Sequence, residues 1–217
     1  MRRELSHTEF HTRILLSRAH KEEKVVAKPL VMGRKEIAMV YNIAPTAVSD
    51  RWVPRGTISY EDAVIVSGKP FWPGGLVVDL ALPPGSRGRQ LDEEALGKLE
   101  KAQGAGVRPK VKGELPPLVG AQEYASLFGV DQVHVGQLVK SKSEALPASD
   151  YHLSGSHVWL LSTVLESADK TMSLTRKGLW QLDQSVAEAL SEGRYDGPGS
   201  FIAKRGNYGT GAMSAEK

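Results

Sequence analysis

The chain has 217 residues, of which 41% are hydrophobic, and its 28 Lys and Arg against 25 Asp and Glu give a formal net charge of +3. This length suits one or two domains with ordinary cores, and the absence of cysteine excludes disulfides and thiolate metal sites. No run of about 18 apolar residues marks a transmembrane helix, and the charged start has no apolar signal core. We therefore expect a cytoplasmic protein with no membrane partner.

The first 28 residues are expected to form an N-terminal helical arm. Residues 4–26 mix apolar and charged side chains without Gly or Pro. Such an arm could dimerise, lie along phosphates, or pack as a solvated helix on the neighbouring segment. His7 and His11 have the i, i+4 spacing of metal-binding helices, but no third ligand accompanies them, so no metal site is expected.

Residues 29–84 are predicted to form a first module. Ile37, Val40 and Tyr41 recur at helical spacing, and Asn42 suits the left-handed turn that ends a helix. Pro45 suits the first turn of a second helix, over residues 45–52. The outward residues of that helix and its end would meet bases or phosphates: Thr46, Ser49, Arg51 and Arg55.

A β-hairpin is predicted to follow, with a Ser67-Gly68 turn between residues 64–66 and 69–72. Lys69 would lie at its tip and contact phosphate or a minor groove. Pro70 favours an edge strand, because proline cannot donate to a ladder. Residues 76–82 fit either a helix delayed by one turn or an extra strand.

Residues 85–116 read as a basic linker that contains a short helix. Arg87 and Arg89 are candidates for phosphate contact. A charged helix is expected over residues 91–102, and its apolar stripe would be Leu91, Ala95, Leu99 and Ala102.

Residues 117–172 are predicted to form a second module of the same kind. Tyr124, Leu127 and Phe128 share a helix face, Gly129 turns the chain, and Asp131 can cap the next helix. Another Ser-Gly turn, at residues 154–155, predicts a second hairpin. The expected outward residues of the helix over 131–140 and of the hairpin tip are Gln132, His134, Gln137, Lys140, Ser156 and His157.

Two helices joined by a tight turn and followed by a hairpin make a winged helix-turn-helix. The segment from Val119 to Ala168 resembles the compact winged-helix DNA-binding domains of the MerR and phage-excisionase type, in which a hairpin ending in Trp leads into another helix. The order of elements carries this resemblance rather than any single residue. It implies binding of double-stranded DNA.

The same pattern occurs twice, 87 residues apart. Gly33, Glu36 and Trp72 correspond to Gly120, Glu123 and Trp159. Matches at turn and core positions indicate an internal repeat. The expected fold is therefore mainly α with small β-hairpin wings (α+β), as two tandem winged helix-turn-helix modules with flanking helices. The second module is acidic, which makes it less suited than the first to binding the phosphates of DNA.

Residues 173–192 are predicted to form a C-terminal helix, and residues 193–217 a flexible, Gly-rich tail. The helical stripe over 174–190 could pack on the module, or it could pair with a second subunit to form a homodimer. Its members are Leu179, Leu182, Val186 and Leu190.

The sequence predicts no enzyme, because neither a phosphate-binding glycine loop nor a nucleophile elbow occurs; no cofactor and no small-molecule substrate are expected. The function indicated is sequence-specific binding of double-stranded DNA by a bacterial or phage transcriptional repressor or regulator. An architectural role in excision, partition or packaging would use the same chemistry. Outside DNA binding, the alternative is a protein–protein adaptor built from helix-turn-helix modules.

Overall fold

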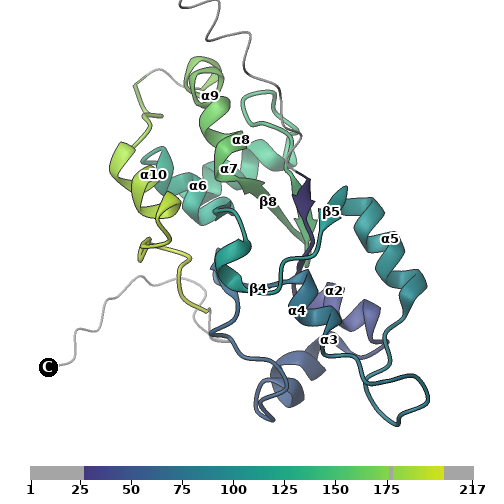
Figure 1. Cartoon of the computed structure of the whole chain (residues 1–217). Coiled ribbons are helices and arrows are strands. Elements are labelled where there is room, and N and C mark those ends of the chain that lie inside the picture. Colours follow the sequence, from purple (N-terminus) through teal and green to yellow (C-terminus); the bar gives the residue numbers. More distant parts are fainter. Residues whose placement is uncertain (1–26, 176–177, 203–217) are drawn as a thin grey trace, which may run out of the picture.

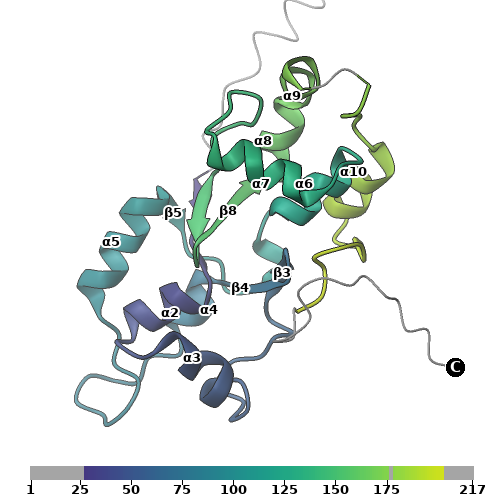
Figure 2. The same cartoon turned by 180° about the vertical axis from the view of Figure 1, so that it is seen from behind.

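The computed structural model describes residues 27–175 and 178–202. The arm predicted over 4–26, with His7 and His11, and residues 203–217 lie outside the described residues. The fold is α+β, with helices around small antiparallel sheets. Figures 1 and 2 show the strands in the middle of the molecule, with α2 to α5 on one side and α6 to α10 on the other. Among the described helices, none has the length and apolarity to cross a membrane.

A first set of elements, called here the first repeat, spans residues 31–78. Its sheet has the order β2-β4-β3, and both pairings are antiparallel. The elements are β2 (Val31–Met32), α2 (Arg34–Val40), α3 (Pro45–Ala47), the π-helical turn η1 (Val48–Trp52), β3 (Val64–Val66), β4 (Lys69–Pro73) and α4 (Gly74–Val78).

The second repeat, residues 118–166, has corresponding elements in the same order, with the single helix α7 where the first repeat has α3 and η1. Its sheet is β6-β8-β7, and Trp159 pairs with Val119 as Trp72 pairs with Met32. The elements are β6 (Leu118–Val119), α6 (Ala121–Leu127), α7 (Gln132–Lys140), β7 (Tyr151–Leu153), β8 (Ser156–Leu160) and α8 (Leu161–Glu166). The predicted 87-residue offset thus relates the strands and helix starts of the two repeats.

Local chemistry explains this shared order. At the start of α2 the Glu36 carboxylate accepts the Gly33 N–H at 3.0 Å, and Glu123 does the same for Gly120 at the start of α6. Both hairpins turn through two residues with positive φ, at 47° and 74° in Ser67-Gly68. Turns of this kind match the twist of the flanking strands.

The prediction that Pro70 lies on an edge strand is wrong, because β4 is the central strand of its sheet. Proline is tolerated there because the strands are short. The pair Val66–Lys69 closes the turn, so the nitrogen of Pro70, one pair further on, faces away from β3. On that side β2 reaches only Trp72 and Pro73. Helix α4 begins directly after Pro73, without the delay allowed for in the sequence.

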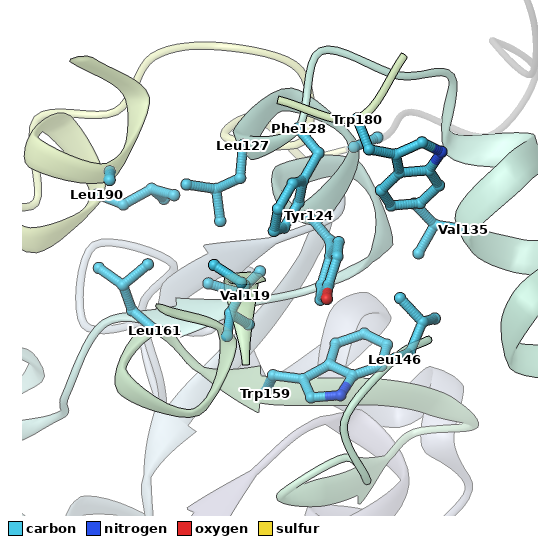
Figure 3. Close-up of a cluster of buried hydrophobic side chains, with 14 residues drawn as sticks. Val119, Tyr124, Leu127, Phe128, Val135, Leu146, Trp159, Leu161, Trp180 and Leu190 are labelled. Carbon is cyan, nitrogen blue, oxygen red and sulfur yellow. The ribbon is translucent and has the colours of Figure 1, made fainter. Parts of the chain in front are cut away.

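Each repeat has its own hydrophobic core, and a third cluster joins them. In the second core, shown in Figure 3, Tyr124 stacks on Phe128 and meets Trp159 edge-on. The first core includes Trp72 and Ile37, both fully buried. The joining cluster takes Leu115 from the segment between the repeats and the following side chains from both sheets: Val31, Val66, Phe71, Leu118, Tyr151, Leu153 and Val158.

The segment between the repeats is folded against the first one. Helix α5 (Glu93–Gln103) buries Leu96 and Leu99 in the first core. The predicted stripe is wrong in part, since Ala102 is exposed and Leu96 is buried. Two further short strands, β1 (Lys28–Pro29) and β5 (Ala105–Val107), pair in parallel, and a 3-10 turn, η2, spans Lys112–Glu114.

The single helix expected over 174–190 is wrong. The structure has α9 (Ala168–Leu174) and α10 (Gln184–Ser191). Asp183 accepts the backbone N–H of Ser185 at 2.9 Å and so starts α10 there, because a short acceptor side chain at this position satisfies unpaired donors. The residues between include Trp180, which is buried against Phe128.

Candidate nucleic-acid interface

The hairpin turns of the two repeats contact each other's helices. Ser67 donates its backbone N–H and its hydroxyl to the Glu123 carboxylate, at 2.7 Å each. Ser154 donates the same two groups to Glu36, also at 2.7 Å each. Both hairpin tips therefore lie between the repeats.

Lys69, predicted to be a free wing-tip contact, lies at this junction. Its ammonium donates to the hydroxyl of Ser156 at 2.5 Å, and these two residues are 87 apart, so they hold the same position in the two repeats. Lys69 is half-buried. The free wing is absent here because the turn before Lys69 is docked on Glu123.

Three cations gather around one groove of the first repeat. Arg34 and Lys35 come from the first turn of α2, and Lys69 comes from the start of β4. The groove has a volume of about 380 Å³. Its other lining residues are Pro45, Thr46, Ser49, Asp50, Tyr60, Pro70, Ser154 and Ile202.

The electrostatics of this groove favour an anion. Burial lowers the pKa of Lys69, and the positive charges of Lys35 and Arg34 lower it further. The nearby carboxylate of Glu36 opposes that shift, but it already accepts bonds from Gly33 and Ser154. Within the described part of the chain, none of the three cations forms an ion pair. The three cations outnumber the carboxylates of Glu36 and Asp50 at this groove, so an incoming phosphate would meet net positive charge.

The second helical segment of the repeat supplies two hydroxyls to the same groove. Thr46 is exposed, and Ser49 donates its hydroxyl to the Thr46 carbonyl at 3.2 Å. Val48, between them, is buried and anchors the segment. Asp50 also lines the groove. Of the predicted contacts on this segment, the structure brings Thr46 and Ser49 together with Lys69.

Four predicted arginines lie outside the groove. Arg51, Arg55 and Arg87 are exposed. Arg89 donates to the Leu80 carbonyl at 2.9 Å and so holds the 83–90 loop on the first repeat.

The second repeat has no such cluster at the equivalent positions. Ala121, Gln122 and Ser156 stand where the first repeat has Arg34, Lys35 and Lys69. The predicted contacts on α7, which are Gln132, His134, Gln137 and Lys140, are exposed. His134 and Gln137 line a different groove, of about 560 Å³, together with Leu138, Leu174, Leu179 and Trp180.

Arg34, Lys35 and Tyr60 are missing from the residues predicted from sequence. A signal for the first two was present. Cations in the first turn of a helix oppose its dipole, so a basic pair there costs free energy unless it serves another purpose. Tyr60 lies in the irregular segment before β3, where periodicity carries no information.

His157, the last predicted contact, is exposed on β8 and its Nδ1 lies 2.9 Å from the Ser149 hydroxyl. Among the residues that the structure describes, no group of three or more His, Cys, Asp or Glu side chains could hold a metal ion. Comparisons with protein-family models, with curated proteins and with solved structures found no match to this chain.

Proposed function

We propose that this chain is a sequence-specific double-stranded DNA-binding protein, a transcriptional repressor or regulator, built from two tandem winged helix-turn-helix modules. The observation that carries the proposal is the groove where Arg34, Lys35 and Lys69 meet beside the hydroxyls of Thr46 and Ser49. The repeated order of two helices, hairpin and helix is that of the winged helix-turn-helix. We assign the first repeat as the DNA-binding one.

In the proposed complex the three cations hold backbone phosphates, because charge neutralisation with release of counterions supplies much of the affinity for DNA. Arg51 and Arg55, exposed beyond the groove, extend these contacts along the duplex. Thr46 and Ser49 stand on the segment that would enter a groove of the duplex and read base edges. The hairpins join the repeats in this arrangement and do not act as wings.

A binding experiment at several salt concentrations tests the proposal. A duplex selected from a random library is labelled, and its affinity is measured by fluorescence anisotropy. Each phosphate contact adds about 0.9 to the slope of log affinity against log salt, so Arg34→Gln with Lys35→Gln should lower the slope by roughly 1.8. Lys98→Gln, on the exposed face of α5, is the matched control. No DNA binding at low salt, or an unchanged slope in the double variant, refutes the proposed interface.

A protein–protein adaptor is the second candidate. It is favoured by the apolar groove beside α7, where Leu174 and Leu179 are 55% and 54% exposed, and by the acidic second repeat. The same titration separates the two functions, because an adaptor would give absent or salt-insensitive DNA binding.

A further inference from the structure

We propose that His152 and His157 form a two-histidine chelate for a divalent transition-metal ion on the second hairpin. The proposal does not depend on DNA binding. The two residues are directly opposite each other in the pairing of β7 with β8. The pair Leu153–Ser156 closes the turn, so the histidines form the next, non-hydrogen-bonded pair, in which side chains approach most closely. Both side chains are exposed and therefore open to an ion from solvent.

The separation of the rings fits a shared ion. The ring centroids are 5.0 Å apart, with an angle of 70° between the planes. With metal–nitrogen bonds of about 2.0–2.1 Å and angles between a right angle and a tetrahedral one, two coordinated imidazoles have centroids roughly 4.5–5.2 Å apart. The pair thus has the spacing of two ligands before any ion arrives.

One of the rings is also held in place. The Nδ1 atom of His157 lies 2.9 Å from the Ser149 hydroxyl, and its ring stacks on Trp159 with 6.2 Å between centroids. Hydrogen bonding at one nitrogen fixes the ring and leaves the other for a metal, as outer partners of metal-binding histidines do. Ser149 is the positioning residue in this arrangement.

The histidine pair is specific to the second repeat. The equivalent pair in the first repeat, with the same register, is Ile65 and Pro70. The same hairpin therefore folds with apolar residues at these two positions, and the fold itself does not require histidines there.

The chemistry of the pair selects the ion. Two imidazoles without thiolate or carboxylate suit Cu²⁺, Ni²⁺ and Zn²⁺, with Cu²⁺ bound most tightly. No third protein ligand of the usual kinds joins the pair among the described residues. Water would complete the coordination, so the site is an open one.

Calorimetric titration of the full chain with NiCl₂ or CuCl₂, in a buffer that does not bind metal, tests the proposal. Three of the six histidines are His7, His11 and His20, so the reference is the full chain with these changed to alanine. We expect one ion per reference chain, and affinity at least tenfold weaker after His152→Ala or His157→Ala. His134→Ala, which removes an exposed histidine from α7, should change nothing.

A second readout locates the ion and guards against misfolding of a variant. Cu²⁺ should broaden the amide NMR signals of residues 149–159 in the reference chain before any others. The His157→Gln variant keeps a polar side chain beside Ser149, and it should give an unchanged near-UV spectrum with weakened binding. An unaffected affinity in both alanine variants, or a reference chain that binds no ion, overturns the proposal.

Discussion

Glu36 and Ser154 are 118 residues apart in sequence, yet two hydrogen bonds of 2.7 Å join them, one from the backbone N–H and one from the hydroxyl of the serine. Glu123 and Ser67 repeat this relationship with the roles of the two repeats exchanged. The repeats therefore contact each other reciprocally, like the subunits of a symmetric dimer fused into one chain. The same carboxylates begin helices α2 and α6, so helix capping and repeat association depend on the same two side chains.

Removing the serine hydroxyls should destabilise the protein. Ser67→Ala leaves the nearly buried Glu123 carboxylate, 2% exposed, without one of its donors. A buried acceptor that loses a partner costs about 1–3 kcal/mol, and more when it is charged. Denaturant unfolding measures this loss, with Ser162→Ala on the exposed side of α8 as control. Equal stability of Ser67→Ala and Ser162→Ala would contradict a stabilising role for the hydrogen bond from Ser67 to Glu123.

Glu123 should make stability depend on pH. Burial raises its pKa above the ordinary value of 4.5, although hydrogen bonds from Ser67 and Gly120 oppose the shift. The folded state then holds this proton more tightly than the unfolded chain. Its contribution is complete below pH 4.5 and is lost as the pH rises through the raised pKa. The stability of the wild type relative to Glu123→Gln should therefore decrease from pH 4 upward in urea titrations. A difference that stays flat would show that the pKa is not raised, and one that increases would show that it is lowered.

Two glycine substitutions should act in opposite directions. A Cβ on Gly120 would collide with the Ser67 hydroxyl and lie 2.9 Å from Val66, so Gly120→Ala should cost about 1–3 kcal/mol. Gly97, inside α5, has no atom within 4 Å of such a Cβ. Gly97→Ala should stabilise by about 0.5–1 kcal/mol, because alanine favours helix interiors. Thermal unfolding of both variants provides the comparison. Stabilisation by Gly120→Ala would mean that the repeats do not approach as closely as described.

The sequence predicted elements whose signals are local, and it failed where contacts between distant segments decide. The Ser-Gly turns follow from residue chemistry and are confirmed. The helical segment over 45–52 begins at Pro45 as predicted, but it is α-helical only to Ala47 and continues as the π-helical turn η1. The predicted stripe of α5 missed Leu96, because packing on the first repeat decides that this residue is buried. The docking of the hairpin before Lys69 could not be foreseen either, since it depends on Glu123, 56 residues beyond Ser67. The cationic groove likewise includes Ser154 of the second repeat, which hydrogen bonds to Glu36, 118 residues away, hold in place.

The pKa of Lys69 should report the positive charge gathered in the groove. Burial lowers its pKa below the ordinary 10.5, and the charges of Lys35 and Arg34 add to the effect. The pH dependence of labelling by acetic anhydride, followed at Lys69 by mass spectrometry, gives an apparent pKa that is separate from the maximal rate set by access. We expect that pKa to rise in Arg34→Gln, which removes one neighbouring cation, and to stay constant in Arg87→Gln, which lies outside the groove. Bound DNA phosphate should raise it as well, because an anion stabilises the ammonium. A pKa that responds to neither Arg34→Gln nor DNA would show that the three cations do not share one site.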